Sequence, residues 1–205
     1  AAWKSLVRIG PHALGAYSAL IDSGTPDQRS RALNVLAKSP GPGPVSLLVD
    51  RIASRDKELK EQVLGILRER PDGGASAIVE ALGHEDSGVR FAATRELVAM
   101  GPRAVPVLVE SAIDSDDPTV RVASIRCLAE LGDERGSKAI IVGMGSGNRK
   151  VRRAAVRAAS QIPAKRYAQR LIELIDDNDD EVRLGAVEAL GASKVVAAVP
   201  TLTQR

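Results

Sequence analysis

His84 and Glu85 are adjacent and are residue types that can ligate a metal ion. A metal site needs several such ligands converging on one point, and the chain has only one other histidine, His12. The pair lies in an expected turn just before Asp86. We therefore interpret both side chains as exposed turn residues, and the sequence predicts neither a metal centre nor a cofactor.

The acidic run 176–181 (Asp-Asp-Asn-Asp-Asp-Glu) offers oxygen atoms of the kind that bind calcium. It lacks the glycine at the sixth position and the distal glutamate of an EF-hand loop. Asp179 suits the cap of a following helix, and acids in a first helical turn interact favourably with the helix dipole. These residues are therefore expected to start a helix.

No combination of nucleophile, base and oxyanion donor is apparent. Cys127 falls on the expected apolar face of a helix, as a small core residue would, and neither histidine is near it in the pattern. The glycine-rich segment 143–147 follows a helix and lacks the Lys-Ser or Lys-Thr of a phosphate loop. We expect no catalytic residues and no enzymatic activity.

A basic stretch extends from Arg135 to Arg170 and contains no acid. Such a stretch suits an anionic partner, either a nucleic acid or an acidic protein surface. The alternative is that Arg152 belongs to a structural ladder and several others are merely solvated. The ten basic residues are Arg135, Lys138, Arg149, Lys150, Arg152, Arg153, Arg157, Lys165, Arg166 and Arg170.

The elements that must position these residues follow from a repeat. Helix N-cap residue types recur at spacings of 31, 30, 31, 31 and 31 residues, at Thr25, Asp56, Asp86, Asp117, Asn148 and Asp179. A residue that is apolar in five of the six copies follows three positions later, and a basic residue comes next, as in Val120-Arg121. Self-similarity at this period predicts a solenoid.

Each unit reads as two helices. In the fourth copy, Asp117 caps a second helix that Pro118 opens and Gly132 ends. The range 102–113 is the expected first helix, with Pro106 early enough to be tolerated. In the first copy, Thr25 and Gln28 form an expected capping box.

The chain resembles the HEAT repeat family in its short bacterial form, which is also found in phycobilin-lyase-like proteins. The likeness rests on 131–135 (Leu-Gly-Asp-Glu-Arg), on Val89-Arg90 and its copies, and on 188–191 (Glu-Ala-Leu-Gly). It implies an all-α fold, a right-handed superhelix of about six two-helix repeats plus a partial repeat at each end. It also implies that second helices line the concave side, with an Asp–Arg ladder between repeats. The family's deoxyhypusine hydroxylases hold two irons with several His-Glu pairs, and this chain has one.

Positions two and six residues after the second-helix Val should point away from the core. Arginine beside apolar residues on such a face is typical of a protein interface. These positions hold Phe91, Arg95, Val122, Arg126, Arg153, Arg157, Leu184 and Glu188. The first six, together with Arg149 and Lys150, are the predicted partner-binding residues.

Bulk properties are consistent with this interpretation. The 205 residues are 44% hydrophobic but only 2% aromatic, and the net charge is +3. No apolar run approaches the length of about 20 residues that a helix needs to cross a bilayer. We expect a single array over 1–205 that is a fragment of a longer, cytoplasmic protein. Both ends match mid-repeat segments, so apolar residues should be exposed there and could mediate self-association: Leu6, Ile9, Val195, Val199 and Leu202.

Repeat architecture without a catalytic set favours a non-enzymatic scaffold that binds a protein or peptide, possibly an acidic one, on its concave face. The alternative is nucleic-acid or other polyanion binding through the basic fifth repeat, 135–170. Few aromatic residues are present for base contacts, and acidic turns flank that repeat. A chromophore-lyase-type helper is a third possibility, but nothing marks a tetrapyrrole site.

Overall fold

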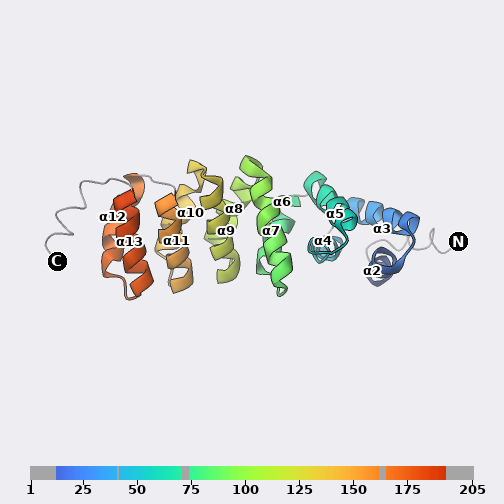
Figure 1. Cartoon of the computed structure of the whole chain (residues 1–205), viewed down its shortest axis with the longest axis horizontal. Coiled ribbons are helices and arrows are strands. Elements are labelled where there is room, and N and C mark those ends of the chain that lie inside the picture. The colour runs from blue at the N-terminus through green and yellow to red at the C-terminus, as the bar shows by residue number, and fades with distance from the viewer. Residues whose placement is uncertain (1–12, 41, 71–73, 162–164, 193–205) are drawn as a thin grey trace. The chain divides into compact units, whose positions relative to one another are not determined.

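The computed structural model describes residues 13–40, 42–70, 74–161 and 165–192. All regular secondary structure in these residues is helical, as Figure 1 shows. The predicted all-α fold is therefore confirmed. The chain divides into two compact units, residues 1–96 and 97–205. The partial repeats expected at both ends, with Leu6, Ile9, Val195, Val199 and Leu202, lie outside the described residues.

The described part of the first unit contains α2 to α6 and most of α7, which crosses the boundary between the two units. α2 packs on α3, and α4 packs on α5, so that consecutive helices form hairpins. A short 3-10 turn, η2, extends α6 before the chain enters α7. The elements are α2 (Leu14–Ser23), α3 (Pro26–Lys38), α4 (Pro42–Val49), α5 (Lys57–Glu69), α6 (Gly74–Glu80), η2 (Ala81–Gly83) and α7 (Ser87–Ala99).

The second unit contains three described helix pairs, which Figure 1 shows in yellow to red. Each first helix packs on the second helix that follows it, and α11 also contacts both α9 and α13. The elements are η3 (Gly101–Arg103), α8 (Val105–Asp114), α9 (Pro118–Leu131), η4 (Glu134–Gly136), α10 (Ser137–Met144), α11 (Arg149–Gln161), η5 (Lys165–Tyr167), α12 (Ala168–Glu173), η6 (Leu174–Asp176) and α13 (Asp180–Ala192).

All six predicted N-cap residues accept a hydrogen bond from the first turn of their helix. The bonds reach Thr25 from Gln28 N (3.3 Å), Asp56 from Leu59 N (3.1 Å), Asp86 from Gly88 N (2.6 Å), Asp117 from Thr119 N (2.7 Å), Asn148 from Lys150 N (2.9 Å) and Asp179 from Val182 N (3.2 Å). The capping box of α3 is present, and Gly132 ends α9 with φ of 66°. Pro106 lies in the first turn of α8, where it is tolerated. The repeat period therefore predicts where the second helix of each repeat begins.

The core of the second unit is rich in small and aliphatic side chains, which allow helices to approach closely, and it also contains the fully buried Tyr167. At Gly185 of α13, an added Cβ would lie 2.6 Å from Val156 Cγ2 of α11. Gly143 of α10 is similarly close to Ile125 of α9. Cys127 is fully buried in α9, as its predicted core position requires. The second helices α9, α11 and α13 are thereby held side by side.

The ladder implied by the HEAT resemblance is present at two places in the described residues. Arg29 pairs with Asp56 of the next repeat (Nη1–Oδ2 2.6 Å), and Arg152 pairs with Asp177 (Nε–Oδ2 2.8 Å). The equivalent arginines of two other repeats instead donate hydrogen bonds to backbone carbonyls of their own hairpin. Arg90 bonds to the carbonyls of His84 and Glu85 in the turn, and Arg121 bonds to that of Ala112 in α8. The position after the second-helix Val is therefore structural in these repeats.

Candidate functional site

A groove of about 700 Å³ lies between α9 and α11 in the second unit. It lies where both helices begin, and Glu181 of α13 contributes to its wall. Six of the eight predicted partner-binding residues line it: Val122, Arg126, Arg149, Lys150, Arg153 and Arg157. The repeat pattern thus brings together side chains from two consecutive second helices.

A smaller hollow of about 380 Å³ continues the groove toward the ends of the same helices. Arg126, Ala154 and Arg157 line both parts, so the two form one continuous channel, here named the α9–α11 groove. Glu130 and Gln161 lie at its far end. Its cations are therefore concentrated at the end where Arg149 and Lys150 begin α11.

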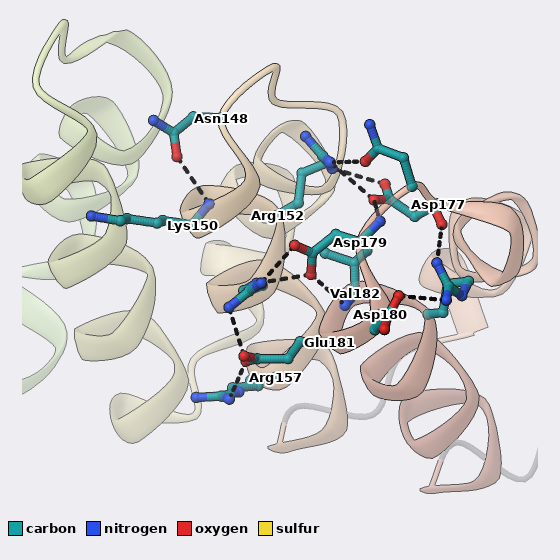
Figure 2. A network of polar contacts seen from close by, with 12 residues as sticks. Asn148, Lys150, Arg152, Arg157, Asp177, Asp179, Asp180, Glu181 and Val182 are labelled. Atoms are coloured by element: carbon teal, nitrogen blue, oxygen red, sulfur yellow. Dashed lines mark hydrogen bonds and ion pairs between the residues drawn. The ribbon is translucent and has the colours of Figure 1, made fainter.

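Arg153 does not lie free in this groove. Its guanidinium forms a bidentate pair with Asp179 (Nε–Oδ1 2.8 Å, Nη2–Oδ2 2.6 Å), and Asp179 is labelled in the network of Figure 2. The Asp179 side chain is only 8% exposed and also caps α13. The hydrogen bonds from Arg153 lower the pKa of Asp179 to about 2. This pair links α11 to α13 and is part of the fold.

Glu181 bridges the two arginines of α11. Its carboxylate accepts hydrogen bonds from Arg153 Nη1 (2.6 Å) and Arg157 Nη2 (2.9 Å). Figure 2 shows it extending from the first turn of α13 toward Arg157. The Glu181 side chain is 47% exposed and that of Arg157 is 65% exposed. Both remain accessible to solvent and to a partner.

Arg126, Arg149 and Lys150 make no ion pair within the described residues. All three are exposed and line the same part of the groove as the half-buried Val122. They are therefore cations whose charge is not already balanced by a neighbouring acid. Together with Val122 they form what we name the free cationic cluster.

Acids outside the basic stretch 135–170 neutralise part of its charge. Five of its ten basic residues form ion pairs, namely Arg135 with Asp133, Arg152 with Asp177, Arg153 with Asp179 and Glu181, Arg157 with Glu181, and Arg170 with Glu173. The absence of acids from the stretch itself therefore overstates its available charge. The structural alternative therefore holds for these five residues, and binding of an anionic partner by the others stays a prediction.

The sequence reasoning missed the partners of the α11 arginines. It interpreted the run 176–181 only as helix-start acids, yet these acids face the arginines of the preceding repeat. A signal was available in the spacing. Arg29 and Asp56 are 27 residues apart and Arg153 and Asp179 are 26 apart. A basic residue just inside one second helix thus meets an acid just before the next.

A model of HEAT repeats matches residues 45–129, 105–191 and 137–205. The chain belongs to the HEAT-repeat family. Members typically act as protein-interaction scaffolds. Comparison with curated proteins returned no match.

Solved structures that resemble this HEAT chain are repeat proteins at low identity. An engineered protein has 24% identity and a TM-score of 0.48, covering 88% of this chain and 96% of that one. Human deoxyhypusine hydroxylase in complex with glycerol has 19% identity and a TM-score of 0.45, covering 96% and 90%. A designed armadillo repeat protein in complex with the peptide (KR)4 has 16% identity and a TM-score of 0.45, covering 88% and 99%.

In the first unit of the HEAT array, Phe91 and Arg95 also point away from the core. Phe91 is 66% exposed, and the Arg95 guanidinium lies 6.0 Å from the centre of its ring. On α13, Leu184 is 60% exposed and Glu188 is exposed. The prediction that these second-helix positions face outward is confirmed.

The remaining residues that could ligate a metal or act as a nucleophile, His84 and Cys127, have contacts that fit a structural role. His84 Nδ1 accepts a hydrogen bond from Asp86 N (3.0 Å), and its Nε2 lies 3.2 Å from Asp50 Oδ1. In the described part of the chain, no three His, Cys, Asp or Glu side chains converge as a metal site would require. Burial raises the pKa of the Cys127 thiol to about 12. No helix among the described residues has the length and hydropathy needed to span a bilayer.

Proposed function

We propose that this HEAT array is a non-enzymatic scaffold that binds an acidic, flexible segment of a partner protein in the α9–α11 groove. The observation that carries the proposal is the free cationic cluster, in which three cations without an ion pair in the described residues line the same groove as Val122. An apolar side chain among arginines supplies area that loses water on contact, while the cations favour carboxylates. The groove is open along the two helices, which suits an extended segment.

Polyanion binding through the whole basic stretch is less well supported. Binding to duplex DNA requires many cations free to neutralise phosphates, and half of the basic residues of 135–170 already have acidic partners. A short acidic segment needs only the few cations of the cluster. The charge balance of the second unit therefore favours a protein partner.

The test measures binding of the full chain to defined probes by fluorescence anisotropy. The acidic probe is a labelled peptide in which glutamates flank a single leucine, and the control peptide has lysines in place of the glutamates. A short labelled DNA duplex represents the polyanion alternative. Each titration is repeated at low and high salt.

We expect the acidic peptide to bind with moderate salt dependence and the lysine peptide not to bind. Duplex DNA should bind more weakly than the acidic peptide. Tighter binding of DNA, with an affinity that falls steeply as salt rises, would favour the polyanion alternative. Equal binding of both peptides, or binding of neither, would contradict the proposed site.

A further inference from the structure

Two carboxylates contact Arg153, and they differ in what else they do. Asp179 is nearly buried and caps α13 by accepting a hydrogen bond from Val182 N. It also accepts hydrogen bonds from Nε and Nη2 of Arg153. Glu181 is half exposed and bonds only to the arginines of α11 among the described residues. Asp179 therefore has a structural role that Glu181 lacks.

The side chain of Glu181 can move away from α11 without breaking the Arg153–Asp179 ion pair that links α11 to α13. If its side chain rotates into solvent, Arg153 keeps both bonds to Asp179 and releases only Nη1. Arg157 loses its sole ion-pair partner among the described residues. Since Arg157 lines both parts of the groove, its charge then becomes available along the whole channel.

We propose that Glu181 is a built-in competitor of the partner, occupying on Arg153 and Arg157 the place that a partner carboxylate takes in the complex. This inference rests on the proposed function, since it concerns the same groove and the same class of partner. The free cationic cluster receives the first carboxylates without competition. A further carboxylate must displace Glu181 to reach Arg157.

The competition tunes affinity and selects for acidic partners. An exchange of one exposed ion pair for another gains little, so wild-type Arg157 contributes weakly to binding. A neutral segment offers no anion to take the place of Glu181 and leaves the bridge intact. Because exposed pairs are weak, removing Glu181 should tighten binding of an acidic peptide by about two- to fivefold.

The test compares Glu181→Gln with Glu173→Gln in the full chain, using the labelled glutamate–leucine peptide. Glu173→Gln also removes an ion pair with a partly exposed arginine, Arg170, but Glu173 does not line the groove. Both variants change the net charge by the same amount. We expect tighter binding for Glu181→Gln only. An unchanged or weaker affinity of Glu181→Gln, or an equal gain in both variants, would overturn the proposal.

A second comparison separates competition from a general loss of negative charge. On an Arg157→Gln background, adding Glu181→Gln should give a clearly smaller gain, because one of the two contested cations is gone and the other, Arg153, stays paired with Asp179. An undiminished gain in peptide affinity would show that Glu181 acts only through long-range electrostatic repulsion of the peptide. If the wild-type chain binds the peptide but Glu181→Gln changes nothing, this inference fails alone. If neither binds, the proposed function fails with it.

Discussion

Arg153 of α11 and Asp179, the cap of α13, form a bidentate ion pair that joins two consecutive repeats. The arginine also faces the α9–α11 groove, so one side chain belongs to both the fold and the candidate site. Arg126 of α9 lines the same groove without an ion pair in the described residues. A substitution of Arg153 should therefore affect both the stability of the fold and binding in the groove, whereas a substitution of Arg126 should affect binding alone.

Replacing Arg153 by glutamine should lower the thermal unfolding midpoint, because the nearly buried Asp179 carboxylate loses its charged partner. The matched variant Arg126→Gln removes an exposed, unpaired arginine from the same groove. It should leave the midpoint unchanged, as surface substitutions usually do. Circular dichroism melts of both variants provide the measurement. Equal midpoints would contradict a structural role for the Arg153–Asp179 pair.

Acid should weaken the second unit through the same pair. Hydrogen bonds from Arg153 lower the pKa of Asp179 from 3.8 to about 2, so the folded state holds the charged form more strongly than the unfolded state does. This contribution is complete above about pH 4 and is lost as pH falls toward 2. Melts across that range should show a falling midpoint, with a smaller fall in Arg153→Gln. The same fall in both proteins would count against the assignment.

Gly185 permits the close approach of α13 to α11. In Gly185→Ala the new Cβ would lie 2.6 Å from Val156 Cγ2, and a stiff β-branched neighbour must shift. Gly191→Ala on the same helix meets no atom within 4 Å. Chemical denaturation should show Gly185→Ala to be less stable than Gly191→Ala by about 1–3 kcal/mol. Similar stabilities would mean that the contact between the helices is loose.

Cys127 should react with a thiol reagent only when the second unit opens. Burial raises its pKa to about 12, so almost no thiolate exists at neutral pH, and its side chain is inaccessible. Labelling by an aromatic disulfide reagent should be slow in buffer and rapid in denaturant. Rapid labelling of the native protein would contradict the buried position.

The ends of the second helix of a repeat could be predicted because they depend on local chemistry, whereas the expected first helix 102–113 is divided between η3 (Gly101–Arg103) and α8 (Val105–Asp114). A cap residue such as Asp117 and a stop such as Gly132 act within one helix, so a periodic sequence exposes them directly. The outward positions of Phe91 and Leu184 followed from helical spacing in the same way. Local signals therefore predict side chains that point outward, and four of these line the α9–α11 groove.

The charge of the groove could not be predicted from the same signals. Whether Arg153 is free depends on where α13 places Asp179, which is a relation between repeats rather than a property of one helix. Arg135 is different, because its partner Asp133 is only two residues away and the pair is a local one. Counting charges in a segment says little about which of them remain unpaired.

The most direct test of the account is the affinity of the glutamate–leucine peptide for two matched triple variants. One variant replaces Arg126, Arg149 and Lys150 of the free cationic cluster by glutamine. The other replaces Arg103, Lys138 and Arg166, which are equally exposed in the second unit, have no ion pair in its described part and do not line the groove.

Both variants lose the same charge, so only the position of the cations differs. The account predicts a loss of about tenfold or more for the cluster variant, the combined contribution of three exposed cations, and nearly unchanged affinity for the other. Equal losses in both variants would show that the peptide responds to net charge alone. That result would contradict a binding site in the α9–α11 groove.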